Sequence, residues 1–180
     1  MNIFYLSDCP IEAAQSQCDK HVVKMILESA QMLCTAHHSH PTDAVRPEKF
    51  YKQTHTNHPS NKWVRECTEN YNWLCLHAMA LCSEYTYRYG KIHASEPIIW
   101  WCLNNIPNIP VLPMTKMPQC MPDEFKADCS VQAYRSFYNV DKRQSFKCVW
   151  TKRDEPKWWS EHLCLEACLL YTSDAADERN

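Results

Sequence analysis

Glycine is almost absent from this 180-residue chain, which contains only Gly90. The phosphate-binding loops of P-loop enzymes, dinucleotide-binding folds and protein kinases need several glycines, because only glycine lets the backbone approach a phosphate closely. The GxSxG nucleophile elbow and glycine-hairpin DNA-binding motifs need more than one as well. A single glycine therefore excludes all these classes of site.

Long apolar runs are also missing, and none approaches the 18 residues that would indicate a membrane span. Asp8 interrupts the N-terminal segment before the apolar region of a signal peptide can form. The twelve cysteines would suit a secreted disulfide scaffold, but such scaffolds are usually shorter. We expect a cytoplasmic protein (in the host cytoplasm if viral), with no membrane partner and with reduced cysteines that mostly fill its core.

The net charge of −2 does not by itself predict a nucleic-acid partner, and a 45% hydrophobic content excludes disorder by composition. The length suits one domain, which we place at residues 1–159, leaving 160–167 unassigned. Residues 168–178 resemble the translation of a transposase-type sequencing adapter. We therefore expect 168–180 to be a non-native tail and the natural chain to be cut near Ala167.

Apolar periodicity predicts an all-α fold, a small single-domain helical bundle with two long helices. The first is expected over 10–37, and the second is expected to begin at Ser60 and to end at a left-handed cap at Gly90. Residues 2–6 read as a strand or an N-terminal plug. Shorter helices are expected at 96–103 and 128–138, with a short helical piece at 48–52 in a polar loop.

Proline and aromatic residues mark the rest of the chain. Five prolines within residues 105–122 exclude a helix or a central strand and predict an extended surface strap. An arm at residues 139–159 mixes basic and aromatic side chains, a composition typical of nucleic-acid contacts. The alternative is that its aromatic residues pack on the core. The expected phosphate contacts in and near this arm are Arg135, Lys142 and Arg143.

Polar side chains recur on one face of the first helix, at Lys20, His21, Lys24 and Glu28. This face could be an ordinary solvated surface with a Lys24–Glu28 ion pair. The functional interpretation makes Glu28 an acid/base or electrostatic stabiliser and uses the two lysines to hold phosphates.

Two further groups are candidates for binding an anion. His55 and His58 precede a helix N-terminus, where anions are favoured, although polar loop packing would explain them equally well. Arg88 and Lys91 lie at the end of the second long helix, where Arg88 could simply pair with Glu84. We include all four basic residues among the expected DNA contacts. No CxxC spacing is present, and we assign no metal site.

Four features together resemble the phage-type pyrimidine-dimer DNA glycosylases, the endonuclease V kind of ultraviolet-repair enzyme. They are a His and a Glu seven residues apart on the first helix, a His that opens the next long helix, an acid and an arginine that close it, and an aromatic-basic C-terminal part. In this chain these are His21 and Glu28, His58-Pro59, Glu84 and Arg88 before Gly90, and residues from Ala133 onward.

The resemblance implies a helical single-domain enzyme, expected to be a monomer, that needs no metal or cofactor. Its partner would be double-stranded DNA with pyrimidine damage. The chain's α-amine would attack C1′ of the damaged nucleotide and form a Schiff base, supported by the essential carboxylate of Glu28 and by His21. Because Asn2 is large, Met1 is expected to stay in place and to carry the amine, whereas the family exposes its nucleophile by removing Met before a small residue. Lys20 and Lys24 would replace the family's helix-one arginines.

Two alternatives stay open from the sequence. The same polar face could belong to a phage enzyme that acts on nucleotides or modified DNA bases. The protein could also be a non-enzymatic helical module whose arm binds a nucleic acid or a protein. A Glu28 remote from both the N-terminus and any concavity would favour this last possibility.

Overall fold

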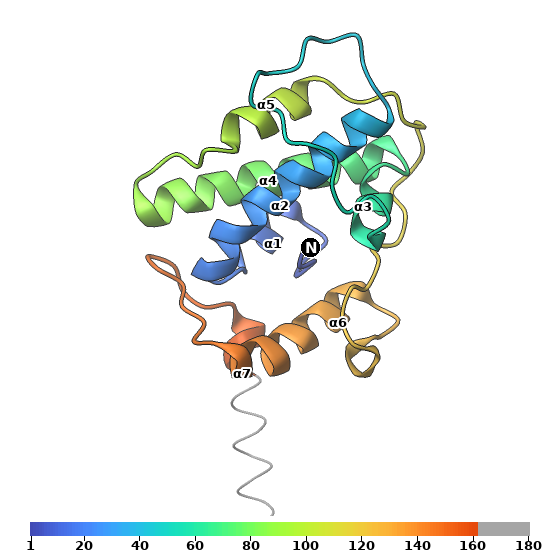
Figure 1. The fold of residues 1–180 in the computed structure, drawn as a ribbon. Coiled ribbons are helices and arrows are strands. Elements are labelled where there is room, and N and C mark those ends of the chain that lie inside the picture. Colours follow the sequence, from blue (N-terminus) through green and yellow to red (C-terminus); the bar gives the residue numbers. More distant parts are fainter. Residues whose placement is uncertain (162–180) are drawn as a thin grey trace, which may run out of the picture.

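The computed structural model describes residues 1–161, and the expected non-native tail at 168–180 lies outside them. The described residues form helices, among them α1–α7, and contain no β-strand, which confirms the all-α prediction (Figure 1). None of these helices has both the length and the apolar content to cross a membrane.

The first long helix is in fact two helices, α1 (Pro10–Gln15) and α2 (Asp19–Ser39), so the prediction of one helix over 10–37 was wrong. Cys18 between them has an extended backbone, and the N–H of Asp19 donates to the Val149 carbonyl at 2.8 Å. Tertiary contacts thus override the continuous apolar period at this point. The break determines where α2 begins, and α2 carries most of the candidate site.

The second long helix is divided in the same way, into α3 (Pro59–Val64) and α4 (Thr68–Tyr89). The Pro-rich strap explains this break, because the N–H of Thr68 at the start of α4 donates to the Pro110 carbonyl at 2.9 Å. Gly90 ends α4 with a φ of 66°, and its N–H donates to the Thr86 carbonyl, as the sequence predicted.

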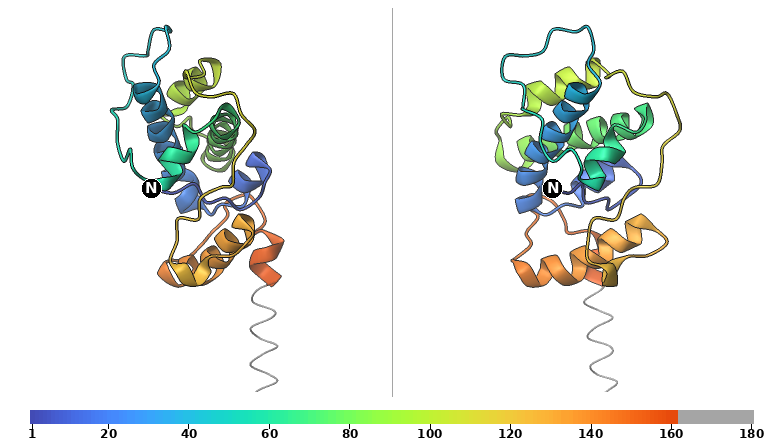
Figure 2. Two further views of the ribbon diagram at one scale, coloured as in Figure 1. Left: turned by 90° about the vertical axis from the view of Figure 1, so that its right-hand side faces the viewer. Right: turned by 45° about the vertical axis from the view of Figure 1, so that its right-hand side comes forward.

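Helix α4 is the centre of the larger layer, and it packs against α1, α2 and α5 (Glu96–Asn104) (Figure 2). The helix expected at 96–103 is therefore confirmed. No helix forms at 48–52, contrary to the prediction, because Phe50 and Tyr51 turn onto the ends of α2 and α5. The Phe50 ring contacts Trp101, and the Tyr51 hydroxyl hydrogen-bonds Ser95 at 2.8 Å.

The Pro-rich strap is extended, as predicted, and it leads into a second, smaller layer (Figure 1). That layer begins with a short 3₁₀ turn, η1 (Asp123–Phe125), followed by α6 (Ser130–Phe137). A π-turn, η2 (Tyr138–Lys142), then leads into α7 (Arg143–Ser145). The helix expected at 128–138 is thus present, but it continues through the π-turn.

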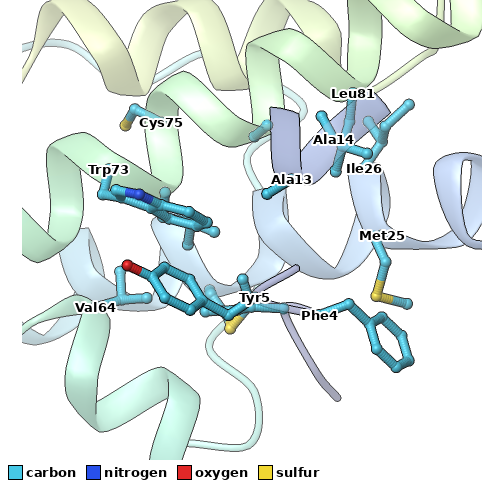
Figure 3. Close-up of a cluster of buried hydrophobic side chains, with 14 of the residues drawn as sticks. Phe4, Tyr5, Ala13, Ala14, Met25, Ile26, Val64, Trp73, Cys75 and Leu81 are labelled. Atoms are coloured by element: carbon cyan, nitrogen blue, oxygen red, sulfur yellow. The ribbon is translucent and has the colours of Figure 1, made fainter. Parts of the chain in front are cut away.

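The sequence left open whether residues 2–6 form a strand or an N-terminal plug, and in the structure they form the plug. Ile3 and Leu6 have no solvent-exposed surface. Figure 3 shows Phe4 and Tyr5 pointing in different directions, Phe4 toward Met25 of α2 and Tyr5 toward Trp73 of α4. The plug therefore contributes to the core of the larger layer and also turns one ring toward the candidate site.

Two buried histidines should make the fold sensitive to acid. Burial lowers the pKa of both His37 and His77 from 6.5 to about 4. His77 donates from Nδ1 to the Pro10 carbonyl at 2.9 Å and accepts from Gln17 at 3.1 Å, so it is held neutral. Below pH 6.5 the unfolded chain binds protons that the folded chain does not bind, so stability is lost as the pH falls toward 4.

We predict that the free energy of unfolding falls by up to about 1.4 kcal/mol per pH unit for each such histidine between pH 6.5 and 4. Urea unfolding at several pH values measures this slope. A His77→Gln variant should have a shallower slope, whereas the exposed control His55→Gln should keep the wild-type slope. Equal slopes in all three proteins would contradict the prediction.

Candidate active site

Glu28 brings the N-terminus of the chain onto α2. Its Oε2 accepts a 2.8 Å hydrogen bond from the backbone N–H of Asn2 and lies 3.9 Å from the amino nitrogen of Met1. Its Oε1 lies 3.5 Å from Nζ of Lys24, one helical turn away. The carboxylate side chain is only 13% exposed, so these charges interact in a partly desolvated place, where they act more strongly than in water.

The Asn2 side chain fixes the geometry of the first residues. Its Oδ1 accepts hydrogen bonds from the backbone N–H groups of Ile3 and Phe4, and its Nδ2 donates to the Cys120 carbonyl at 3.0 Å. Phe4 has a φ of 58°, a left-handed conformation that is uncommon for a bulky residue. The N-terminal amine is therefore held by a tightly turned and hydrogen-bonded segment.

His21 lies about two helical turns before Glu28 on α2 and is enclosed by aromatic rings. The Phe4 ring stacks on it with centroids 4.2 Å apart, and the Phe146 ring meets it edge-on at 5.3 Å. Its Nδ1 is 2.6 Å from the hydroxyl of Tyr138, which is fully buried. The imidazole is thus 6% exposed and fixed in orientation, whereas the sequence placed it on a solvated polar face.

These groups line one hollow of about 380 Å³, a size typical of small-molecule sites. It lies where α2, the N-terminal segment and the second layer meet. Its remaining walls are aromatic and cationic: Nζ of Lys20 lies 4.4 Å from the centre of the Phe146 ring, and Nζ of Lys142 lies 4.4 Å from that of Phe137. The complete lining is Met1, Asn2, Phe4, Lys20, His21, Lys24, Met25, Glu28, Phe137, Lys142 and Phe146.

Charge in the hollow is mostly positive. The Met1 residue and three lysines belong to its lining, in which Glu28 is the only carboxylate contributed by residues 1–161. Lys142 is also paired with Asp141 at 2.8 Å, whereas the Lys24 side chain is 67% exposed. The arrangement suits a ligand with negative charge at the rim and a reacting carbon near the amine and the carboxylate.

Comparisons of this chain with protein-family models, curated proteins and solved structures found no match. The chemistry of the hollow must therefore be argued from its own residues.

The two loop histidines are placed differently. His58 is the N-cap of α3 and accepts from the N–H of Ser60 at 3.2 Å. Burial lowers its pKa, the positive Met1 amine and His55 lower it further, and Glu28 raises it. His58 is therefore close enough to be influenced by both charges, but it is not among the residues that line the hollow. His55 is exposed, hydrogen-bonds Thr54 and is not part of the lining.

Arg88 is not available to DNA, so its assignment as a DNA contact was wrong. Its side chain has no exposed surface and bonds Glu84 at 3.0 Å and Asp19 at 3.0 Å, as well as the backbone carbonyls of Gln15 and Gln17. All three guanidinium nitrogens thus donate hydrogen bonds to groups inside the fold. The simpler interpretation of Glu84 and Arg88 as an ion pair is the one that the structure bears out.

Three further expected DNA contacts, Lys91, Arg135 and Arg143, lie outside the hollow. Lys91 is exposed just beyond the end of α4. Arg135 donates to the Leu6 carbonyl and lines a separate cleft with Trp158. Arg143 stacks on Trp159 at 3.7 Å and donates to the backbone of Asn139 and Trp159. The arm therefore packs its aromatic side chains inward, the alternative that the sequence left open, and its Phe146 reaches the hollow.

Sequence reasoning did not identify Phe4 and Met25 as walls of the site, nor Tyr138 as the partner of His21. The sequence offered only two signals for these residues, the apolar run at residues 2–6 and the aromatic content of the arm. Neither signal indicates which groups the side chains would contact. Within residues 1–161, no group of three or more His, Cys, Asp or Glu side chains lies close enough to hold a metal ion.

Tyr138 is expected to be essential to the geometry of the site. Its oxygen accepts from the Cys18 backbone N–H at 3.0 Å and hydrogen-bonds His21, so Tyr138→Phe leaves two buried polar groups without a partner. We predict a loss of about 1–3 kcal/mol in the free energy of unfolding, measured in urea. Tyr87→Phe, which removes an exposed hydroxyl bonded to the Lys152 carbonyl, should change stability by less than about 0.5 kcal/mol. A similar effect of the two substitutions would contradict this role.

Proposed function

We propose that this protein is a DNA-repair glycosylase and abasic-site lyase that acts on damaged pyrimidines in double-stranded DNA. The single observation that carries the proposal is the 3.9 Å separation of the Met1 amine and the Glu28 carboxylate in one hollow. An amine beside a carboxylate suits Schiff-base chemistry at a sugar carbon, because the carboxylate can accept the proton that the attacking amine gives up.

In the proposed reaction the Met1 nitrogen attacks C1′ of the damaged nucleotide. The bond between C1′ and the amine forms while the glycosidic bond breaks, and the electron pair of that bond leaves with the base. Glu28 takes the proton that the amine gives up and stabilises the positive charge that develops on the sugar. Glu28 then returns that proton to O4′ as the C1′–O4′ bond breaks, which opens the sugar ring and turns the adduct into an imine. Loss of a proton from C2′ to a base expels the 3′ phosphate by elimination, which cuts the strand.

The other residues of the hollow have matching roles. Lys20, Lys24 and Lys142 hold phosphates around the opened nucleotide, and Phe4, Phe137 and Phe146 offer flat apolar walls to a displaced base or sugar. Opening the duplex costs a few kcal/mol, and a damaged base pair lowers that cost. His21, held by Phe4 and Tyr138, borders the reacting centre.

The alternatives differ in what they require of the hollow. A non-enzymatic module has no need for Glu28 beside the N-terminus, so the observed proximity supports an enzyme. An enzyme for nucleotides or modified bases could use the same residues. Activity on free nucleotides, with none on irradiated duplex, would favour it.

We predict that sodium borohydride traps the wild-type protein covalently on an irradiated oligonucleotide duplex, because the reductant fixes an imine between the amine and the sugar. Glu28→Gln should keep duplex binding but abolish trapping and strand cleavage, both measured on denaturing gels. Glu69→Gln, an exposed glutamate on α4, serves as the matched control and should behave as wild type. Cleavage by the Glu28→Gln protein would refute the proposal.

We predict that the lysines of the hollow determine the salt dependence of DNA binding. If Lys24→Ala and Lys142→Ala each remove one phosphate contact, each should reduce the slope of log K against log salt by about 0.9. Titration of a labelled duplex at several salt concentrations measures the slope. Lys91→Ala, outside the hollow, should leave the slope unchanged. An effect of Lys91→Ala as large as theirs would place the DNA on another surface.

A further inference from the structure

The hydroxyl oxygen of Tyr138 is the centre of a buried hydrogen-bond network behind His21. It accepts from the backbone N–H of Cys18 at 3.0 Å and donates to Sγ of the same residue at 3.3 Å. A third contact, at 2.6 Å, joins it to Nδ1 of His21. Tyr138 has no exposed surface, and burial raises its pKa well above the ordinary value, so the phenol keeps its proton.

These three contacts determine which nitrogen of His21 carries a proton. A phenol hydroxyl has one proton and two lone pairs. The proton is directed to Sγ of Cys18, and the backbone N–H of Cys18 occupies one lone pair. The second lone pair can only accept, so Nδ1 of His21 is the donor in the 2.6 Å contact. The neutral imidazole then has its free lone pair on Nε2.

Nε2 of His21 is open toward the hollow. It makes no hydrogen bond to any of residues 1–161, yet it is not sealed in the interior, unlike Nδ1 of His37, which is buried without a partner. The Phe4 ring stacks on the imidazole and the Phe146 ring meets it edge-on, so the imidazole is held in this orientation. Because His21 lines the hollow, its lone pair is available to a ligand there.

Among the described residues of the lining, the other polar side chains offer no free acceptor. Lysine ammonium groups are donors only. Oε2 of Glu28 accepts from the Asn2 N–H at 2.8 Å, and its Oε1 lies 3.5 Å from Nζ of Lys24. Oδ1 of Asn2 already accepts from two backbone N–H groups. In the proposed reaction the Met1 nitrogen is bonded to the sugar when C2′ loses its proton, so His21 is the base that remains for that step.

We propose that His21 removes the C2′ proton, and that Tyr138 and Cys18 are the positioning residues that fix its tautomer. Nε2 takes the proton, and the electron pair of the C2′–H bond forms a double bond to C1′ as the protonated imine becomes an enamine. The enamine then re-forms its C=N bond and shifts the other double bond to C2′–C3′. The C3′–O bond breaks, its electron pair leaves with the 3′ phosphate, and the imidazolium gives its proton to water. This step rests on the proposed lyase function.

The tautomer can be measured without DNA. Nitrogen NMR spectra of the isotope-labelled full chain, recorded where the imidazole is neutral and assigned with the His21→Gln protein, should show the His21 proton on Nδ1. Cys18→Ala removes the sulfur acceptor, so the Tyr138 proton turns to Nδ1 and the imidazole proton should move to Nε2. Cys34→Ala, which truncates another buried cysteine on α2, should keep the wild-type tautomer. A wild-type imidazole protonated on Nε2 would overturn the proposal.

A duplex with one abasic site separates the two steps of the reaction. His21→Gln should still be trapped by borohydride, because the imine forms without it, whereas strand cleavage should fall by about 10²–10⁴-fold, the usual contribution of a general base. Cys18→Ala should also be trapped normally and cleave more slowly. His38→Gln, which changes an exposed histidine near the other end of α2, should trap and cleave as the wild type does.

The outcomes distinguish this inference from the proposed function. Normal trapping together with wild-type cleavage by His21→Gln would refute the role of His21 and leave the lyase function in place. A wild-type protein that neither is trapped nor cleaves would refute both.

Discussion

The buried guanidinium of Arg88 is the contact on which the arrangement of the helices depends. It projects from α4 and bonds Glu84 on its own helix, Asp19 at the start of α2, and the carbonyls of Gln15 and Gln17 at the break before it. Asp19 and Glu84 in turn accept from Thr151 and Arg153 of the arm. Removing one partner from such a buried network leaves an uncompensated charge, so these segments are held in one arrangement.

The Arg88 network also affects the candidate site, which lies farther along α2. Because Arg88 fixes where α2 starts, it also fixes the direction in which His21 and Glu28 point. The N-terminal segment then packs between the layers and meets Glu28 through the Asn2 N–H and the Met1 amine. The site is therefore built from both ends of the described chain on a helix whose starting point is set by a buried ion pair.

Much of the fold and part of the site could be predicted from local pattern. Apolar periodicity predicts the buried faces of α2 and α4. The backbone preferences of glycine and proline predict the cap at Gly90 and the extended strap. The two helix breaks could not be predicted, because they are caused by hydrogen bonds to Val149 and Pro110, far away in the chain. Arg88 was misplaced for the same reason, since its partners on α1 and α2 are distant in sequence.

The sequence by itself determined that the protein is helical, that it cannot cradle phosphate in a glycine loop, and that His21, Lys24 and Glu28 share a helix face. These properties depend on residue type and on spacing within a few turns. Only the tertiary structure decided that the Met1 amine meets Glu28, that Phe4 and Tyr138 enclose His21, and that the arm turns its rings inward. Such contacts join residues up to 117 positions apart, and only the packing of the layers brings them together.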